Sequence, residues 1–555
     1  VAAWSAVIGL SLSLGLGTVA AEAADVTRAQ VEEAIRQGVR YLKSQQKPDG
    51  SWRQADNEAR TGSTSLATLA LLTAGETAKE AEIARALDYL RQFGPEDLRS
   101  TYDVALQTMV FAAADPERDK LRLTRNVAWL EAAQIKLADR VPWPGTWTYS
   151  ASKTRQGDNS NTQYALLGLH AAAEVGIPVK TQIWALSREH FLGSQNRDGS
   201  WGYTPLGGGG ATGSMTCAGV SSLVITGLKR FTGREVVVGE AINGCGEGGF
   251  HPDLQRGLDW LAVNFSVGQN PGQEQTWKFY YLYGLERVGR LSGQRFLGQN
   301  DWYREGARLL VSTQDPLRQG FWRGVGTESD PLIATSFAVL FLAKGRAPVL
   351  MNKLRHGPGR DWNNDVDDVR NLVSSVSRDW KTLLTWQVSD PGTASVADLL
   401  QAPIAYFNGH EPPAFSSEAK ANLRSFVEQG GFIFAEACCG RPEFDRGFRA
   451  LIGELFPEPE YTLKPLPPEH AVWRSRYRLT PDVHPLWGID FGCRTVVVYS
   501  PSDLSCFWNQ SEMQPDNAAV IKALRVGQNV VDYATGRELP ADKLEVREVR
   551  DFRKD

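Results

Sequence analysis

Cysteine residues carry the most versatile chemistry in this chain, because a thiolate can act as a nucleophile, a redox group or a metal ligand. The chain has 555 residues and six cysteines, and four of these lie in its last quarter. Those four are Cys438, Cys439, Cys493 and Cys506. The adjacent pair directly follows the apolar run 430–436, which predicts a buried strand. We therefore expect any sulfur chemistry in the C-terminal part.

The sequence leaves three roles open for the adjacent cysteine pair. It can join Cys493 or Cys506 in a structural disulfide, which an exported protein permits. It can remain reduced and buried. It can also form a reactive or metal-binding site with a histidine or with a carboxylate such as Asp445 or Asp503. Geometry decides between them, because a reactive thiol needs a base within hydrogen-bond reach.

A second group of candidate residues is polar and aromatic and belongs to the first part of the chain. A polar run at 158–164 precedes an apolar helical pattern, and aromatic residues recur near residue 280. Such residues can line a pit for an apolar or sugar ligand. Helix capping and plain packing between helices are the alternatives. The candidate ligand contacts are Asn161, Gln163, Tyr164, Trp277, Tyr280 and Tyr281.

The elements that position these residues are two alternating sets of helices. One set is amphipathic and suits an outer layer: 30–45, 83–92, 121–135, 183–195, 254–265 and 303–314. The other set is apolar nearly all round and suits an inner layer: 65–74, 102–114, 162–175, 216–228, 277–288 and 333–343. Six pairs at a roughly constant period predict a closed (α/α)6 toroid over residues 26–350.

A repeated turn follows several outer helices. Gln195 leads to Gly199-Ser200-Trp201, and Gln45 leads to Gly50-Ser51-Trp52; weaker copies run from Gln134 to Trp147 and from Gln314 to Trp322. This pattern resembles the Gln-Trp repeat of squalene–hopene cyclases and related terpenoid cyclases. Protein prenyltransferase β-subunits share the same toroid. The resemblance implies the fold and carries no chemistry.

The chemistry of those families has weak counterparts here. Class II terpenoid cyclases use an Asp-x-Asp-Asp acid, and this chain has that pattern at 365–368, beyond the last inner helix. There it suits the start of a helix instead. Cys217, Cys245, His170, His190 and His251 show no zinc-ligand spacing, so we predict no metal and no cofactor. The run 244–248 resembles the thioester sequence of complement-type toroids but lacks the acyl-donating Gln.

After a boundary near 350–360, where 352–364 reads as a loop, the pattern changes to strands alternating with helices. Buried strands are predicted at 402–409, 430–436 and 495–500, with a helix at about 416–429. Alternation of this kind predicts a parallel sheet of flavodoxin-like type over residues 358–555. The loops at the carboxyl ends of the strands are the expected ligand address, with Cys438, His410 and Asp503 near it.

The stretch Glu436-Ala437-Cys438-Cys439-Gly440 resembles the strand-to-helix turn of class I glutamine amidotransferase-like domains. The resemblance implies that Cys438 is the nucleophile, although Glu436 replaces the first glycine of that motif. The family's base is a histidine, for which His484 and His470 are the candidates after Cys438. The region is also similar to domain of unknown function 4159, which occurs with such toroids in bacterial proteins and has no established reaction.

The composition and the N-terminal segment predict where the protein is located and which partners it lacks. The net charge of -4 is spread without a basic stripe, so we predict no nucleic-acid partner. Residues 1–24 read as a signal peptide whose basic n-region is missing, and we predict no other membrane span. We expect a periplasmic or secreted bacterial protein.

Three hypotheses about function follow. The first is an exported protein whose toroid and α/β domain bind an unknown small molecule or protein without established catalysis. The second is a cysteine-dependent hydrolase or amidotransferase-like enzyme at Cys438. The third is a terpenoid- or prenyl-handling enzyme in the toroid.

Overall fold

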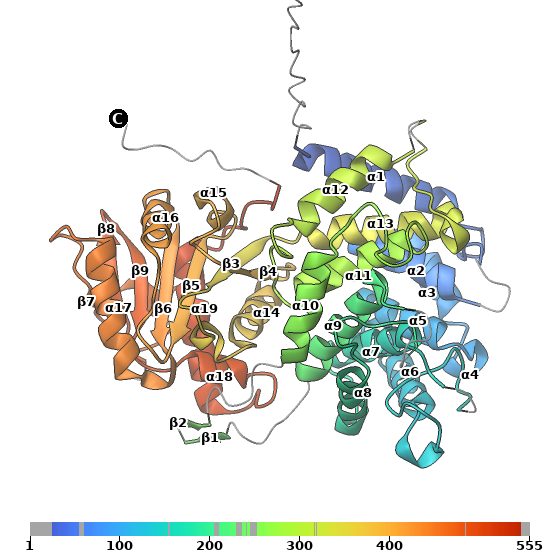
Figure 1. Cartoon of the computed structure of the whole chain (residues 1–555), viewed down its shortest axis with the longest axis horizontal. Helices are drawn as coiled ribbons and strands as arrows, with labels where there is room; N and C mark the ends of the chain where they lie inside the picture. Colours follow the sequence, from blue (N-terminus) through green and yellow to red (C-terminus); the bar gives the residue numbers. More distant parts are fainter. Residues whose placement is uncertain are drawn as a thin grey trace, which may run out of the picture.

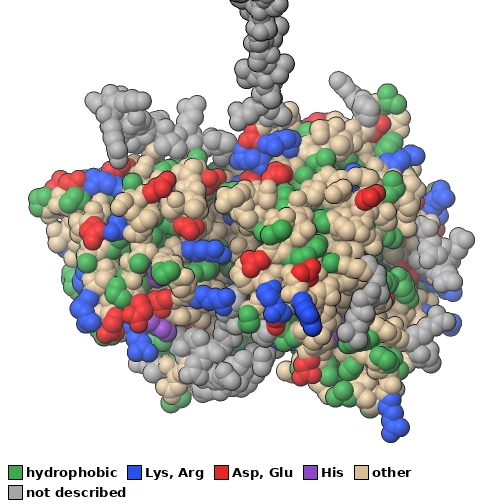
Figure 2. Space-filling model, in the orientation of Figure 1, with side chains coloured by type: hydrophobic (Ala, Val, Ile, Leu, Met, Phe, Trp, Pro, Cys, Tyr) green, Lys and Arg blue, Asp and Glu red, His purple; other side chains and the backbone are tan. Residues whose placement is uncertain are grey.

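Figure 1 shows the computed structural model of the chain, in which a helical part and a part with a central sheet stand side by side. The structure describes residues 25–54, 60–153, 156–204, 210–228, 236–239, 241–244, 252–315, 317, 319–482 and 484–544. The predicted signal peptide at 1–24 lies outside them. Among the described residues, no helix has both the length and the apolar character needed to cross a membrane. On the face seen in Figure 2, basic and acidic side chains are interspersed.

The helical part is built around a closed ring of buried helices. Each contacts the next in the order α2, α5, α7, α9, α11, α13 and then α2 again. Their bounds are Gly62–Thr73, Thr101–Ala114, Asn159–Glu174, Gly213–Leu228, Lys278–Leu291 and Pro331–Gly345. Nearly every side chain of α9 and α13 is buried, as expected for helices with no polar face. The predicted inner helices are therefore confirmed.

Amphipathic helices alternate with these along the chain and cover the ring from outside. They are α1, α3, α6, α8, α10 and α12, at Arg28–Ser44, Ala81–Leu90, Lys120–Ala133, Thr181–Gly193, Pro252–Val263 and Trp302–Thr313. The start of α1 has a capping box between Thr27 and Gln30, which satisfies backbone N–H groups at the helix end. Two short helices (α4, Pro95–Leu98; η1, Leu137–Asp139), the turn helix η2 (Gly326–Ser329) and a hairpin (β1, Val236–Val238; β2, Ala241–Asn243) lie between the larger elements.

The repeated turn follows four of the outer helices, α1, α6, α8 and α12, and joins each of them to an inner helix. The indole N–H of Trp201 donates to the carbonyl of Phe191 at 3.0 Å, and its backbone N–H donates to Thr216 of the inner helix. Trp52, Trp147 and Trp322 make the equivalent bonds to Leu42, Leu130 and Leu310. The turn glycines hold positive φ angles, for example +93° at Gly199, where an added Cβ would meet the carbonyl oxygen of Arg256.

The glutamine of each turn reaches the following outer helix. Gln195 donates to the carbonyl of Asp253, and Gln314 donates to the carbonyl of Ala34 in α1. In the first repeat the residue with this role is Gln46, which donates to Glu82, and not the predicted Gln45. Gln45 is off by one position and bonds only locally to Ser44. The bond from Gln314 to α1 joins the last outer helix to the first.

The C-terminal part contains a sheet of seven strands in the order β4-β3-β5-β6-β9-β8-β7. Their bounds are Val349–Leu354 (β3), Thr385–Ser389 (β4), Ile404–Gly409 (β5), Phe432–Ala437 (β6), Lys464–Pro465 (β7), Trp487–Phe491 (β8) and Arg494–Ser500 (β9). The strands from β4 to β9 are parallel, and β8 and β7 extend the sheet antiparallel. The parallel order matches that of flavodoxin-like doubly wound sheets.

Helices cover both faces of this sheet. One apolar core packs α14 (Asp368–Trp380), α18 (Ser505–Asn509) and α19 (Ala518–Thr535) on one face. A second core packs α15 (Val396–Leu399), α16 (Ser417–Glu428) and α17 (Pro442–Leu455) on the other. Short turns of 3-10 helix occur at Asp361–Asn363 (η3), Cys438–Gly440 (η4) and Ala471–Arg474 (η5). This arrangement fits the predicted α/β class.

The sheet begins earlier in the chain than the sequence pattern indicated. We expected a polar loop at 352–364 and a domain start at 358, but β3 already runs from Val349 to Leu354. Its polar residues misled the prediction because they are buried with partners. Asn352 donates to the carbonyl of Leu399, and Lys353 forms an ion pair with Asp368 at 2.7 Å. Buried polar side chains of this kind require such partners.

Candidate functional site

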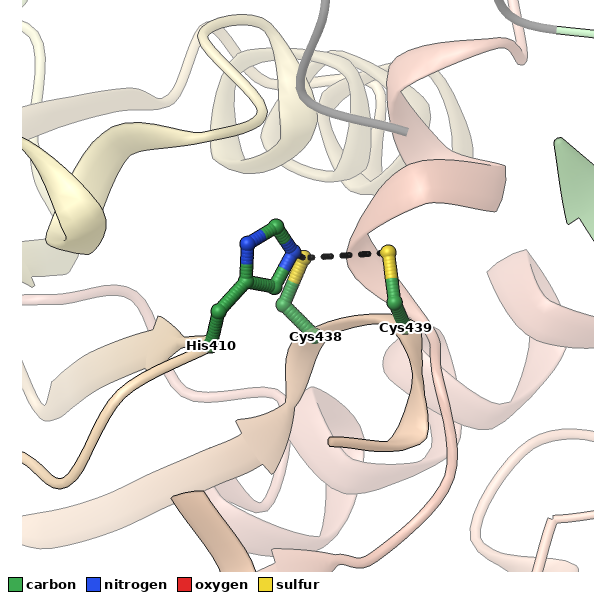
Figure 3. Close-up of side chains that lie close together, drawn as sticks. All are labelled: His410, Cys438 and Cys439. Carbon is green, nitrogen blue, oxygen red and sulfur yellow. Dashed lines mark hydrogen bonds between the residues drawn. The ribbon is translucent and has the colours of Figure 1, made fainter. Parts of the chain in front are cut away.

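The candidate site lies where the carboxyl ends of β5 and β6 meet. Gly409 pairs with Ala437 in the parallel register, so the next residues, His410 and Cys438, leave the sheet side by side. Figure 3 shows the imidazole of His410 against the sulfur of Cys438, with Cys439 on the following turn. This is the edge at which open α/β sheets bind ligands.

His410 connects the cysteines with a carboxylate. Its Nε2 lies 3.3 Å from Sγ of Cys438, and its Nδ1 lies 4.0 Å from Oδ1 of Asp361. Asp361 also accepts the backbone N–H of His410 and that of Glu411, which fixes the carboxylate beside the ring. A thiol, an imidazole and a carboxylate thus stand in sequence, which is the arrangement of a cysteine nucleophile with an oriented base.

Cys439 occupies a tight turn between β6 and α17. Its φ of 54° is in the left-handed region, which costs a non-glycine residue on the order of 1 kcal/mol. Strained residues of this kind cluster at functional sites. Helix α17 begins at Pro442, and the positive end of a helix dipole favours a nearby thiolate. Cys439 is half-buried, whereas Cys438 is 0% exposed.

The two thiols differ strongly in their acidity. The pKa of Cys439 is lowered to about 5, mainly by a hydrogen bond from Cys438 and also by the hydrogen bond and charge of His410. Donating that bond raises the pKa of Cys438 well above its usual range, and burial beside Asp365 adds to this. The hydrogen bond with Cys439 raises the pKa of His410. The stable arrangement is therefore a Cys439 thiolate beside a protonated His410.

Buried carboxyl groups surround the buried thiol. Asp365 accepts a hydrogen bond from Ser505 at 2.7 Å, and its Oδ2 lies 3.3 Å from Sγ of Cys438. Burial raises the pKa of Glu436 to about 7, and its carboxylate accepts the backbone N–H of Leu504. Burial also raises the pKa of Asp503 well above its usual range. The hydrogen bond to Cys439, burial and these neighbouring carboxyl groups keep Cys438 protonated.

The sulfur atoms do not form the disulfides that the sequence allowed. Cys438, Cys439 and Cys493 lie outside any disulfide, so of the three roles left open by the sequence, the disulfide with Cys493 or Cys506 is not the one in the structure. Cys506 is disulfide-bonded, and its partner is none of these three. Its sulfur nevertheless lies 3.7 Å from that of Cys439. Cys493 is exposed on the turn between β8 and β9.

Three groups of side chains have the spacing that one metal ion requires, with ligand atoms within 4.8 Å of one another. They are His410 with both adjacent cysteines, Asp365 with Cys438 and Cys506, and Asp503 with Cys439 and Cys506. A disulfide sulfur carries no thiolate for a metal, so the two groups that contain Cys506 fit poorly. The group of His410 with the two adjacent cysteines is also the thiol–imidazole pair described above, and that pairing does not require a metal ion.

His484, the base suggested by the sequence, contacts residues that follow β9. Its Nδ1 is 3.3 Å from Oγ of Ser502, and its ring meets Phe507 edge-on. The structure instead brings His410 to Cys438. Asp445 bonds Arg449 and Tyr499. The sequence placed His410 near the strand ends and left open a reactive site of the adjacent cysteines with a histidine, but it did not predict the pairing of His410 with Cys438 or the part of Asp361. His410 and Cys438 each directly follow a strand, and this shared position was the sequence signal that could have indicated their pairing.

The candidate ligand residues of the toroid pack mainly against one another. Tyr280 shares its hydroxyl with Gln163 and with Ser160, the latter at 2.6 Å. Tyr164 stacks on Tyr280, with ring centroids 6.0 Å apart. Trp277 meets Tyr280 edge-on and is 38% exposed. The structure thus brings Gln163, Tyr164, Trp277 and Tyr280 together in one cluster.

In the described part of the structure, the side-chain contacts of Asn161 and Tyr281 are with residues outside that cluster. Asn161 donates both its backbone and side-chain N–H groups to Asp158, which caps α7. Tyr281 is fully buried beside Gly213. Asp158 is therefore the residue that caps α7.

The other motifs of the sequence have structural roles or lie outside the described residues. Asp367 forms an ion pair with Arg370, and Asp368 begins α14. The acidic pattern 365–368 thus belongs to the α/β part. Cys217 is buried in α9, where desolvation raises its pKa far above the usual range. Cys245 and His251 lie outside the described residues.

A cavity of about 1140 Å³ lies between the two parts. The toroid contributes apolar residues such as Leu223 and Leu258, and the α/β part contributes Arg355, Trp362 and Trp386. Segment 360–367 separates this cavity from the cysteines: Trp362 and Val366 line the cavity, while Asp361 and Asp365 contact His410 and Cys438. A mixture of apolar and polar lining residues is typical of small-molecule sites.

Comparison with known proteins gives one family match and several structural neighbours. Residues 351–535 match the model described as domain of unknown function (DUF4159). No curated protein matches the chain. Among solved structures, a substituted type II terpene cyclase MstE from Scytonema in complex with geranylgeranyl dihydroxybenzoate is 12% identical, with a TM-score of 0.38. The match covers 57% of this chain and 97% of that chain. The apo form of the same cyclase is 12% identical, with a TM-score of 0.25, and the match covers 57% of this chain and 98% of that one.

Proposed function

We propose that the protein is a cysteine-dependent enzyme of the hydrolase or amidotransferase type, with its reaction centre at Cys438, Cys439 and His410. One observation carries this proposal: His410 places Nε2 3.3 Å from Sγ of Cys438 and Nδ1 4.0 Å from Asp361. The side chains come from different strand ends, so the fold assembles them at its ligand-binding edge.

Within this site, Cys439 is the better nucleophile. It is half-buried and ionised at neutral pH, with a pKa of about 5, whereas the Cys438 thiol is inaccessible and protonated. Cys438 then acts through its hydrogen bond to the Cys439 sulfur, which stabilises the thiolate. The sequence-based proposal that Cys438 itself attacks remains the alternative, and matched variants separate the two.

The reaction class follows from a thiolate beside an imidazolium. The sulfur of Cys439 attacks an acyl carbon, and His410 protonates the leaving group as the tetrahedral intermediate collapses to a thioester. His410, now neutral, removes a proton from water or an amine, which attacks the thioester; the acid or amide is released, and the Cys439 thiolate is restored beside protonated His410. Asp361 holds the ring in the required orientation through its contact with Nδ1.

The toroid's contribution to this proposal is the cavity between the two parts. Its size suits a small molecule, and its lining residues come from both parts, so a bound ligand would contact the toroid and the segment that carries Asp361. A prenyl-handling role has less support, because the carboxylates of the 365–368 pattern are engaged within the α/β part. We propose periplasmic or secreted localisation as well, since a disulfide at Cys506 fits an oxidising compartment.

Labelling with iodoacetamide tests the proposed nucleophile. At pH 6.5, with reductant present, we expect mass spectrometry to find Cys439 as the fastest-labelled cysteine in the wild type. Cys439→Ser should remove that label, and Cys438→Ser should slow labelling at position 439. Cys493→Ser is the matched control, because Cys493 is an exposed thiol away from the site. Hydrolysis of p-nitrophenyl acetate gives a parallel measure of acyl transfer.

Two results would overturn this assignment. Fastest labelling at Cys438, retained in the Cys439→Ser variant, would return the nucleophile to Cys438. Labelling that appears only after treatment with EDTA would show that an ion occupies the cysteines and His410, and the thiol mechanism would then be wrong.

A further inference from the structure

Three sulfur atoms gather at the carboxyl edge of the sheet. The sulfur of Cys506 lies 3.7 Å from that of Cys439 and 3.8 Å from that of Cys438, and the adjacent pair is separated by 4.0 Å. Cys506 belongs to α18, which follows β9, so the third sulfur reaches the site from a separate element. At these distances Cys439 and Cys506 are in direct contact.

The three sulfurs differ in chemical state. Cys506 is disulfide-bonded, whereas Cys438 and Cys439 are not in disulfides. Cys439 is the sulfur that the site ionises, and Cys438 stays protonated in the buried acidic surroundings. A thiolate in contact with a disulfide sulfur is the reactant pair of thiol–disulfide exchange.

We propose that Cys439 exchanges with the disulfide of Cys506, and that the resulting Cys439–Cys506 bond switches the nucleophile off. This inference rests on the proposed function, because the switched group is the proposed nucleophile. Cys439 is placed to start the exchange because it is half-buried and its sulfur touches Cys506.

The exchange is balanced without any other reactant. The electron pair of the Cys439 thiolate forms the new bond to Sγ of Cys506. The existing sulfur–sulfur bond of Cys506 breaks, and its electron pair leaves on the former partner sulfur, which takes up a proton from solvent. One disulfide is lost and one is formed, so the protein is neither oxidised nor reduced. An external dithiol would reduce either disulfide and release Cys439.

The test compares full-length protein with and without tris(2-carboxyethyl)phosphine. Each sample is labelled with iodoacetamide at pH 6.5 and mapped by non-reducing peptide mass spectrometry. We expect a Cys439–Cys506 peptide pair only without reductant, and at least a twofold rise in Cys439 labelling once reductant is added. Cys506→Ser should make Cys439 labelling independent of reductant. Cys438→Ser should keep the dependence, because Cys438 does not start the exchange.

The outcomes separate this inference from the proposed function. If Cys439 labels rapidly and equally with and without reductant, and no Cys439–Cys506 pair is found, the exchange is wrong and the nucleophile stands. If Cys439 stays unreactive in reductant, both proposals fail. Cys506→Ala serves as a second variant, and thermal unfolding identifies a variant that fails to fold. Cys493→Ser should behave as the wild type.

Discussion

His410 and Cys438 are 28 residues apart in the chain, yet Nε2 of one lies 3.3 Å from Sγ of the other. The parallel register of β5 and β6 fixes this distance, because Gly409 pairs with Ala437. Both side chains therefore depend on the sheet for their position, and the loops beyond them add Asp361 and Cys439 to the same edge. A site held by rigid strands is suited to chemistry that needs fixed geometry.

Replacing His410 tests the pairing directly. His410→Asn removes the imidazolium that stabilises the Cys439 thiolate, so we expect its labelling at pH 6.5 to fall about tenfold or more. His484→Asn is the matched control, because His484 contacts Ser502 and Phe507. An equal loss in the two variants would remove the case for His410 as the partner.

The low pKa of Cys439 predicts a distinctive pH profile for its labelling. With a pKa of about 5, the thiolate fraction is complete above roughly pH 6 and falls below about pH 5. N-acetylcysteine in the same solution reports an ordinary thiol, whose rate rises about tenfold per pH unit up to about pH 8. A Cys439 profile parallel to that of N-acetylcysteine would contradict the assignment.

The ion pair of Lys353 and Asp368 is fully buried, and its rupture should be costly. Lys353→Met leaves a buried carboxylate without its cation, so we expect the free energy of unfolding to fall by about 3–5 kcal/mol. Urea denaturation measures this change. The pair of Lys420 and Glu454 is more exposed, and Lys420→Met should cost less than about 1 kcal/mol. Similar costs at the two pairs would mean that burial does not govern this interaction.

Glu328 should make the stability of the toroid depend on pH. Burial raises its pKa to about 7 from an ordinary 4.5, so the folded protein binds the proton more tightly than the unfolded chain does. Stability from this group is therefore greatest below about pH 4.5 and declines, on the order of 2 kcal/mol, as the pH rises to about 7.

Glu328→Gln should flatten that decline, because the amide stays neutral at every pH; it keeps one of the two oxygens that accept the N–H groups of Phe279 and Tyr280. Thermal unfolding at pH 5 and pH 8 measures the difference, with the exposed Glu117→Gln as control. An unchanged difference between the two pH values in Glu328→Gln would exclude Glu328 as its source.

The adjacent glutamines of the first repeat provide a matched pair. Gln46 donates to the carbonyls of Gly50 and Glu82, whereas Gln45 bonds only to Ser44. We expect Gln46→Ala to lower the free energy of unfolding by about 1–2 kcal/mol, because buried carbonyls lose a donor. Gln45→Ala should change it by less than about 0.5 kcal/mol. The reverse order would restore the sequence-based alignment of the repeat.

Much of the fold could be predicted because the pattern of apolar residues along a helix indicates which of its faces are buried. Helices such as α9 and α13 are apolar all round, and only an inner position accommodates that pattern. The prediction failed at β3 because Asn352 and Lys353 are polar but buried, and their partners lie far along the chain or in the following segment. Local pattern cannot reveal a partner that only the tertiary structure supplies.

The site was harder to predict than the fold for the same reason. Cys438 is the candidate nucleophile because its strand-to-helix turn resembles that of glutamine amidotransferase-like domains, whereas its pairing with His410 depends on a strand register that the sequence does not state. The acidity of Cys439 depends on the left-handed turn and on the neighbouring thiol. The residues of the toroid cluster were identified by type, and their packing against one another required the structure.

The bond from Gln314 to Ala34 has a consequence for how the helical part resists unfolding. A linear array of repeats has two exposed end units, from which it can fray and which need polar caps. Here a hydrogen bond joins the last outer helix to the first, and the inner helices form a closed ring. Every helix pair therefore has a neighbour on both sides. Removing one helix pair from such a ring requires breaking its contacts with two neighbours. The ring therefore lacks the weakly held end at which a linear repeat protein begins to unfold.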